Sequence, residues 1–308
     1  MSKKIIFMGT PLFAVPILKS LYQNGYPISV VYTQPPQKSH RGQKINKSPV
    51  QGISETLNID FRSPEKLNNN DEEYNFLKEL NADLAIVVAY GQLIPKKFLD
   101  LTKKGFINIH GSLLPKWRGA APIQRAIQHK DKETGISIMK IVNELDAGPF
   151  LKQVKISIKH DTNFTDLSNS LSNLGAKVLL ESLSQIESKN FKYIEQDHEN
   201  ATYAKKMQKR EFKINWNIKA DDLVAQINSL SRFPGAWFEL EKKRYKILKA
   251  VEIKDKSGKP GEVLDENLVI ACCNNSIQII ELQREGKKAM SANEFLIGNK
   301  VKKGTKLN

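Results

Sequence analysis

"FINIHGSLLPKWRGAAP", residues 106–122, joins a short apolar strand to a loop punctuated by proline and glycine. Side chains alternate across a strand, so Phe106, Asn108 and His110 share one face and the intervening isoleucines share the other. Burying an unpaired amide costs roughly 1 to 3 kcal/mol. Either the loop satisfies these polar groups, or the strand ends in the crevice where open α/β sheets bind ligands. The alternation by itself leaves both interpretations open.

Around this strand, short apolar segments alternate with amphipathic helical patterns through the first half of the chain. Residues 84–90 are continuously apolar, which is typical of a strand buried on both faces. The pattern predicts a doubly wound, mostly parallel Rossmann-like sheet covered by helices. The expected strands are residues 5–9, 28–33, 84–90, 106–110 and 136–142.

The second half of the chain has a different pattern. A polar, charged stretch follows residue 188, and after it short strands are separated by turn residues such as those in "DKSGKPG". Short strands at such spacing predict a smaller β-barrel domain of the OB type. We therefore expect a larger α/β domain over residues 1–188, a linker over 189–205 and the barrel over 206–308.

Composition adds a partner class. The 308 residues carry a formal net charge of +15, with a pI of about 9.5. From Lys205 onward there are 22 Lys/Arg against 13 Asp/Glu, so the positive charge is concentrated in the smaller domain. Such an excess favours an anionic partner, nucleic acid ahead of a membrane surface, although a Lys-rich composition can also serve solubility alone.

Location and redox state follow from what the sequence lacks. No apolar run reaches the roughly 18 to 20 residues that span a bilayer, and the N-terminus has no apolar signal-peptide region. The adjacent Cys272 and Cys273 make a poor disulfide pair. We expect a cytoplasmic monomer with no membrane partner and reduced cysteines.

The motif "NIHGSLLPKWRGAAPIQRAI" resembles the signature of the folate-dependent formyltransferase family, and within it the members that act on methionyl-tRNA. Further matches are "FMGTPLFAVPIL", "TQPPQKSHRGQKINKSPV", "VVAYGQLIPK" and "LDAGP", followed in the small domain by "YAKKMQKREFKINW" and "GKKAMSANEFL". These motifs occur in the family's order and extend over essentially all 308 residues.

The resemblance implies transfer of the formyl group of 10-formyltetrahydrofolate to the amino group of methionine on initiator tRNA, for translation initiation. The motif-matched catalytic residues are Asn108, His110 and Asp146. Asn108 and a protonated His110 would stabilise the oxyanion, and one such donor contributes on the order of 10² to 10³ in rate. Asp146 would orient the imidazole and relay the amine's proton through water. Which group finally takes that proton stays open.

The resemblance also implies binding residues for both substrates. Folate would contact the loop Ser112, Leu113, Leu114 and Pro115, and its pterin would border Tyr90 and Leu93. For the two loop leucines, plain loop packing is the alternative. An apolar strand end like the one at Tyr90 and Leu93 looks much the same in any α/β core.

Residues 34–48 form a long loop with five basic side chains, counting His40, and two prolines. Long loops in compact domains are often functional. The resemblance suggests that this one enters the acceptor end of tRNA, with Arg41 at the first position of the acceptor and Lys38, Lys44 and Lys47 beside it. A solvated, charged loop is the alternative.

No GxGxxG follows the first strand, so a nicotinamide cofactor is not expected, and no Cys/His cluster has metal-ligand spacing. The rivals within the family are glycinamide ribonucleotide formyltransferase, sugar-nucleotide formyltransferases and a formyltetrahydrofolate hydrolase. The first usually has Pro where this chain has Gly111, and the second departs from "RGAAPIQRAI". A nucleic-acid-binding module with an inactive site is a rival from another class, which the intact Asn108, His110 and Asp146 argue against.

Overall fold

The computed structural model describes residues 4–38, 45–188 and 191–308 and divides into two compact units. The first unit comprises Met1–Pro122, Thr134–Ile156 and Ser168–Ala204, and the second comprises Ile123–Glu133, Ser157–Leu167 and Lys205–Asn308. The chain therefore passes between the units more than once. The domain boundaries at residues 188 and 205 stay a prediction.

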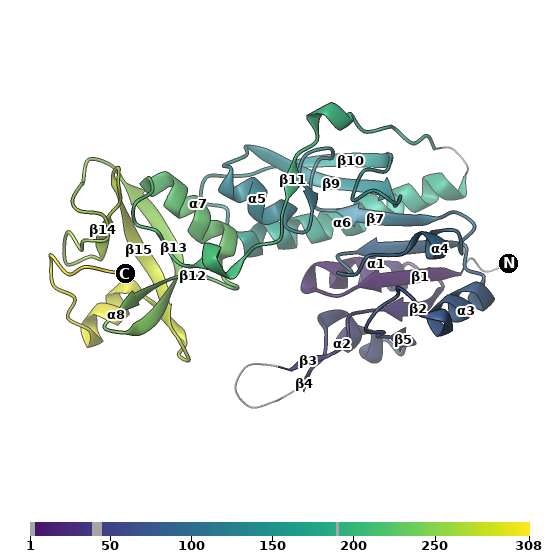
Figure 1. Ribbon diagram of the computed structural model, residues 1–308, viewed down its shortest axis with the longest axis horizontal. Coiled ribbons are helices and arrows are strands. Elements are labelled where there is room, and N and C mark those ends of the chain that lie inside the picture. The colour runs from purple at the N-terminus through teal and green to yellow at the C-terminus, as the bar shows by residue number, and fades with distance from the viewer. Residues whose placement is uncertain (1–3, 39–44, 189–190) are drawn as a thin grey trace. The chain divides into compact units, whose positions relative to one another are not determined.

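The first unit contains a seven-stranded sheet in the order β10-β9-β7-β6-β1-β2-β5 (Figure 1). Strands β6, β7, β1, β2 and β5 pair in parallel, whereas β9 runs antiparallel to β7. The mostly parallel Rossmann-like sheet is thus confirmed. Its strands are β1 (Ile5–Gly9), β2 (Ile28–Tyr32), β5 (Phe61–Arg62), β6 (Leu84–Val88), β7 (Phe106–His110), β9 (Glu133–Lys140) and β10 (Phe150–Ser157).

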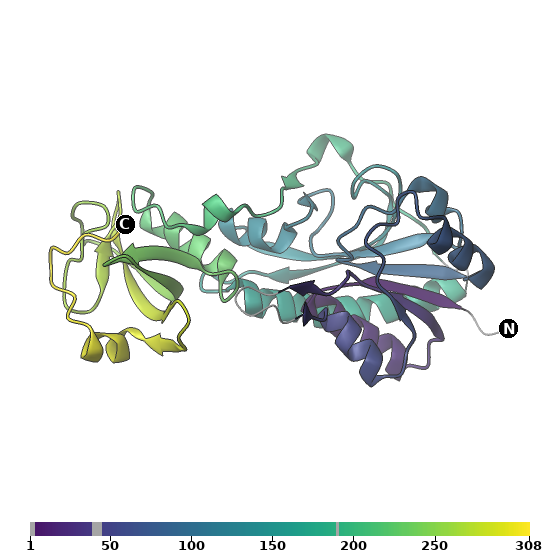
Figure 2. The same cartoon turned by 60° about the horizontal axis from the view of Figure 1, so that its bottom comes forward.

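Helices cover the two faces of this sheet and include α1 (Val15–Gln23) and α6 (Phe164–Glu187), which lie on the same side (Figure 2). A methyl group at Gly175 of α6 would lie 3.1 Å from Cγ2 of Ile109 and 3.4 Å from Cδ1 of Ile17. The isoleucine face of β7 therefore packs on α6 and α1. The opposite face carries Phe106, which belongs to the buried cluster formed with Leu77 and Phe98. The remaining helices of the first half are α2 (Pro49–Thr56), α3 (Asp71–Leu80), α4 (Lys96–Leu99) and α5 (Pro122–Gln128), with a 3-10 turn η1 (Leu12–Ala14).

Local sequence explains where helices begin. The Ser48 side chain accepts a hydrogen bond from the Gln51 amide, and Pro49 occupies the first turn of α2. Asn70 caps α3 in the same way by accepting from the Glu73 amide, and three acidic residues follow in the first turn. α3 ends at Leu80, and the left-handed backbone of the C-cap residue Asn81 (φ +48°) is one that Asn tolerates.

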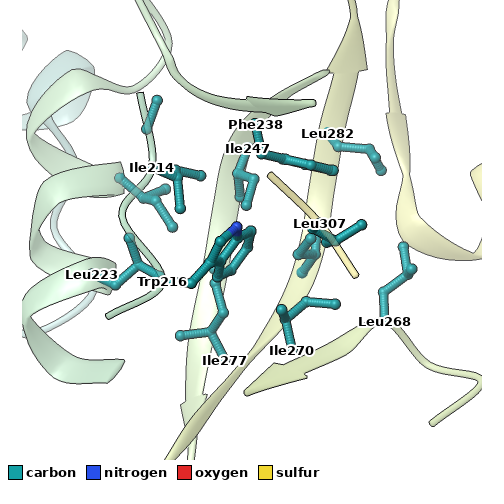
Figure 3. Close-up of a cluster of buried hydrophobic side chains, with 14 of the residues drawn as sticks. Ile214, Trp216, Leu223, Phe238, Ile247, Leu268, Ile270, Ile277, Leu282 and Leu307 are labelled. Atoms are coloured by element: carbon teal, nitrogen blue, oxygen red, sulfur yellow. The ribbon is translucent and has the colours of Figure 1, made fainter. Parts of the chain in front are cut away.

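The second unit is a curled, antiparallel five-stranded sheet in the order β12-β13-β15-β14, with β16 on β15 (Figures 1 and 2). Its core gathers around Trp216, with side chains from α7, β12, β13 and β15 pointing at the indole (Figure 3). This is the small β domain that the strand spacing predicts. Its elements are η3 (Lys209–Phe212), α7 (Ala220–Leu230), β12 (Ala236–Leu240), β13 (Lys243–Ile253), β14 (Val269–Ala271), β15 (Ser276–Arg284), β16 (Ala289–Ser291) and α8 (Ala292–Gly298).

The predicted strands of the main sheet omit two that the structure contains, β5 and β10. In the second unit, Val263 and Glu262 form isolated bridges, with Ile270 and Lys306 respectively. Cys272 is buried, Cys273 is exposed and both are free thiols. Within the described ranges, no helix is both long and apolar enough to cross a membrane.

Candidate active site

His110 ends strand β7, and both of its ring nitrogens face acceptors. Nε2 lies 2.9 Å from the carbonyl oxygen of Trp117, and Nδ1 lies 3.7 Å from Oδ2 of Asp146. A carbonyl only accepts, so Nε2 carries a hydrogen and donates it to Trp117. The short bond that orients the ring therefore comes from the Trp117 backbone, a group that sequence reasoning did not single out. The distance to Asp146 exceeds that of a direct hydrogen bond.

Asp146 reaches His110 from the loop that follows β9. Its Oδ2 accepts a hydrogen bond of 2.7 Å from the amide of Gly119, and its backbone is left-handed, with φ +49°. Asp is among the few residue types that tolerate this conformation. Two residues later, a side chain at Gly148 would place its Cβ 1.9 Å from the carbonyl oxygen of Lys140. The loop that aims Asp146 thus requires glycine at 148.

Asn108 lies two residues before His110 on the same face of β7, half-buried beside Val87 and Met139 of the neighbouring strands. Within residues 4–38, 45–188 and 191–308, its amide side chain makes no hydrogen bond to protein. An unoccupied amide next to an oriented imidazole and a carboxylate can bind an oxygen atom that develops negative charge. The structure therefore brings together the three residues that the motif singles out.

The predicted folate loop is tightly bonded to its own domain. The Ser112 hydroxyl donates to the carbonyl of Lys116, and the Leu114 amide donates to Ser137 Oγ at 3.1 Å. Leu114 is buried, while Leu113 and Pro115 are half-buried. The side chains of Ser112 and Leu114 stabilise the loop internally. A ligand would therefore contact mainly the backbone of these two residues and the half-buried side chains of Leu113 and Pro115.

Tyr90 and Leu93, predicted beside the pterin, differ in exposure. The Tyr90 ring is 2% exposed within the core cluster of the sheet, and burial raises the pKa of its hydroxyl. Its carbonyl accepts hydrogen bonds from Thr10 Oγ1 and Gln34 Nε2. Leu93 is 77% exposed, so it is the side chain of this pair that a ligand can reach.

The predicted tRNA-entry loop is described only at its base. Two short strands, β3 (Gln37–Lys38) and β4 (Ile45–Asn46), pair antiparallel, and Arg41 and Lys44 lie outside the described residues, as does the side chain of Lys38. Lys47 lies on the exposed surface, with its ammonium 2.8 Å from Oε2 of Glu55. That hydrogen bond lowers the pKa of the Glu55 carboxyl.

One segment beside the site was not predicted from the sequence to lie there, because its residues show no apolar periodicity. Residues 191–204, predicted as part of a linker, lie against the loop after β7 through the parallel pair β8 (Arg118–Gly119) and β11 (Tyr203–Ala204). Buried Gln196 belongs to this segment, as does the 3-10 turn η2 (His198–Asn200). Among the described residues, no cluster of His, Cys, Asp or Glu has the make-up of a metal site.

An oriented imidazole, an amide and a carboxylate at the end of a strand in an open α/β sheet can stabilise a developing oxyanion and relay a proton, which is the chemistry of an enzyme acting at a carbonyl carbon. The family model described as Formyl transferase matches residues 3–183, and that described as Formyl transferase, C-terminal domain, matches residues 206–300. The chain belongs to the formyl transferase family.

Two curated relatives match the chain from end to end. The methionyl-tRNA formyltransferase of Pelagibacter ubique (strain HTCC1062) is 55% identical over 308 residues, which cover 100% of this chain and 99% of the relative. The methionyl-tRNA formyltransferase of Chelativorans sp. (strain BNC1) is 41% identical over 312 residues, covering 100% of both chains.

Solved structures show the same fold at lower identity. HypX from Aquifex aeolicus in complex with tetrahydrofolic acid has a TM-score of 0.64 and 17% identity over 99% of this chain and 51% of that chain. The N-formyltransferase from Helicobacter canadensis, in complex with folinic acid and dTDP-3-aminofucose, has a TM-score of 0.67 and 19% identity over 92% of this chain and 100% of that chain. At such identities the likeness concerns the fold alone.

Proposed function

We propose that this protein transfers the formyl group of 10-formyltetrahydrofolate to the amino group of methionine esterified to initiator tRNA. The observation that carries the proposal is the 55% identity, over the full length, to a protein named methionyl-tRNA formyltransferase. In the reaction a C–N bond forms to the methionyl amine and the formyl carbon's bond to N10 of the folate breaks. The amine loses a proton and the departing nitrogen gains one, so the step needs no oxidant or reductant.

Asn108 and His110 would stabilise the oxyanion that develops on the formyl oxygen. The unengaged amide of Asn108 is free to donate. Because His110 Nε2 is bonded to the Trp117 carbonyl, Nδ1 is the nitrogen left for the substrate, and it donates only from a doubly protonated ring. Asp146, 3.7 Å from Nδ1, supplies the opposite charge. The same carboxylate would accept the amine's proton through a water molecule.

Folate would bind along the loop Ser112–Pro115 and against Leu93. The carbonyl of Leu114 already accepts from Gln153 Nε2 at 2.8 Å and that of Ser112 accepts from Ser137, so the loop is preorganised. A loop held in one conformation binds a ligand without an ordering cost. In this proposal Tyr90 supports the pterin site from the core, through its backbone carbonyl and its buried ring.

The tRNA would be held by the basic loop (Lys38, Arg41, Lys44 and Lys47) and by the barrel domain. On the outer face of β12 and β13, the guanidinium of Arg244 lies 3.9 Å from the ring centroid of Trp237, and Lys213 lies 5.6 Å from the same ring. Basic side chains interleaved with aromatic rings suit phosphates and unpaired bases. Because the substrate is a component of translation, the proposal places the protein in the cytoplasm. The monomeric state expected from the sequence stays a prediction.

The test is formyl transfer from 10-formyltetrahydrofolate to methionine charged on initiator tRNA. Uncharged initiator tRNA, elongator methionyl-tRNA, glycinamide ribonucleotide and an amino-sugar nucleotide are assayed in parallel. Formylation confined to the charged initiator is expected. Faster formylation of a small amine would replace the proposed acceptor while keeping the site.

A further inference from the structure

The segment that follows α6 is bonded directly to the loop that carries the candidate active site. The amide of Trp117 donates to Thr202 Oγ1 at 2.9 Å, and the amide of Arg118 donates to the Thr202 carbonyl at 2.8 Å. The Thr202 amide in turn donates to the carbonyl of Pro115 at 3.2 Å. Trp117 is the residue whose carbonyl orients His110. The predicted linker therefore supports the backbone beside the imidazole.

Gln196, in the same segment, joins two loops through one side-chain amide. Its Oε1 accepts from Arg118 Nη2 at 2.8 Å and from Arg118 Nε at 3.1 Å. Its Nε2 donates to the carbonyls of Asp146 at 2.9 Å and Gly148 at 2.6 Å. Gln196 is 4% exposed and Arg118 is 3% exposed. Both amide hydrogens and both oxygen lone pairs are thus used inside the protein.

The two bonds donated by Gln196 end on backbone that is conformationally demanding. Asp146 is left-handed, and Gly148 packs where a Cβ would overlap the Lys140 carbonyl. Residues in sparsely populated backbone regions persist only where their surroundings hold them. The carbonyls of Asp146 and Gly148 are held by Gln196, while the Asp146 carboxylate is held by the amide of Gly119.

Arg118 completes the connection from the other side. Its guanidinium is buried, and its partners are Gln196 Oε1 and His198 Nδ1, the latter 3.2 Å away. Arg118 lies between Trp117, which orients His110, and Gly119, which binds the Asp146 carboxylate. The bonds from Arg118 through Gln196 to the carbonyls of Asp146 and Gly148 thus connect the loop beside His110 to the loop that carries Asp146, in addition to the direct bond from Gly119 to the Asp146 carboxylate.

We propose that Gln196, anchored by Arg118, is a positioning residue for formyl transfer: it holds the Asp146 loop so that the carboxylate faces His110. This inference rests on the proposed function for its kinetic consequences. A purely stabilising Gln196 would affect how much protein folds, whereas a positioning Gln196 affects the rate at which folded protein turns over.

Two variants of the full-length protein distinguish the bonds that Gln196 accepts from Arg118 from those that it donates to Asp146 and Gly148. Gln196→Ala removes all four bonds. Gln196→Glu keeps the oxygen that accepts both hydrogen bonds from Arg118 but replaces the amide donor with a carboxylate oxygen facing two carbonyls. If the bonds to Asp146 and Gly148 position the loop, Gln196→Glu should be impaired despite its new charge pair with Arg118. Gln185→Ala, on the exposed side of α6, is the matched control.

The kinetic readout is kcat and KM for methionyl-tRNA and for 10-formyltetrahydrofolate, with thermal unfolding midpoints measured alongside. We expect kcat to fall by about 10²-fold in both Gln196 variants, because misplacing a catalytic group by about 1 Å has effects of that size. Both KM values should stay within about threefold, as for a residue that acts in the transition state. Gln185→Ala should match the wild type.

A second readout is independent of activity. The ring resonances of His110, assigned by comparison with His110→Ala, should shift in both Gln196 variants and stay in place in Gln185→Ala. If the wild type formylates no tRNA, the proposed function fails while this spectrum still decides the positioning role. A Gln196→Glu protein with wild-type kcat and an unshifted His110 would overturn the inference. If Gln196→Ala does not fold, Gln196→Glu alone carries the test, since it leaves Arg118 paired.

Discussion

Two arginines mark two regions of this protein that handle polar groups in opposite ways. Arg118, in the loop after β7, is almost fully buried and bonds to Gln196 and His198. Arg244, on the outer face of β13, is exposed and stacks on Trp237. In the first region, buried hydrogen bonds hold polar side chains in fixed positions. In the second region, a positively charged side chain is exposed to solvent on the surface of an apolar core.

The difference reflects the physics of each task. Transfer chemistry depends on donors held within a fraction of an ångström, which requires buried bonds in a low-dielectric site. Holding a polyanion depends on the number of phosphates neutralised, and exposed cations on flexible stems do this without a fixed geometry. Changes in the first region should therefore alter kcat, and changes in the second should alter tRNA affinity and its dependence on salt.

The largest effect is expected from His110→Ala and Asp146→Asn. Either change removes one side of the imidazole–carboxylate pair. A single acid–base group typically contributes roughly 10² to 10⁴ in rate. Because the two groups act as a unit, losing either one should lower turnover by about 10³-fold or more. Single-turnover formylation and unfolding midpoints measure this. Glu144→Gln, an exposed acid in the same loop, is the control. Turnover close to wild type in either variant would remove that residue from the mechanism.

Next is Asn108→Ala. Loss of one oxyanion donor should lower kcat by about 10²- to 10³-fold with little change in KM for either substrate. The fold should be unaffected, because within the described part of the chain this side chain bonds to no protein group. A rise in KM without a fall in kcat would instead assign Asn108 to ground-state binding.

A smaller effect is expected on the barrel surface. Arg244→Ala should raise the KM for methionyl-tRNA by roughly threefold to tenfold and reduce the slope of log affinity against log salt by about one. The kcat at saturating tRNA should be unchanged. Lys256→Ala, which removes an exposed lysine paired with Asp265, is the charge-matched control. An equal effect of both substitutions would mean that net charge, and not this surface, matters.

The smallest effect concerns Lys47 and Glu55. If Lys47 contacts tRNA, its salt bridge with Glu55 competes with that contact. Glu55→Gln should therefore tighten tRNA binding by about twofold, and Lys47→Ala should weaken it similarly, because exposed ion pairs are weak. Filter binding at low salt resolves such changes. If both variants bind tRNA with the wild-type affinity, Lys47 lies outside the tRNA site. Only the other basic residues of the entry loop would then remain as candidates for tRNA contact.

Strand positions and the polar face of β7 could be read from the sequence because they depend on local alternation. The predicted strands at residues 5–9 and 106–110 coincide with β1 and β7. The antiparallel orientation of β9 in the sheet could not be predicted from the sequence, because the residues of an apolar strand do not indicate its direction.

By itself, the sequence determined the class of the main sheet, the shared face of Asn108 and His110, the basic second domain and, through its motifs, the resemblance to formyltransferases. Only the tertiary structure decided that Trp117 orients His110 by its carbonyl, that Asp146 lies 3.7 Å from the imidazole and that Gln196 joins both loops. The reason is physical. Alternation and capping arise between near neighbours, whereas the Gln196 bonds join groups 48 to 78 residues apart and leave no periodic trace.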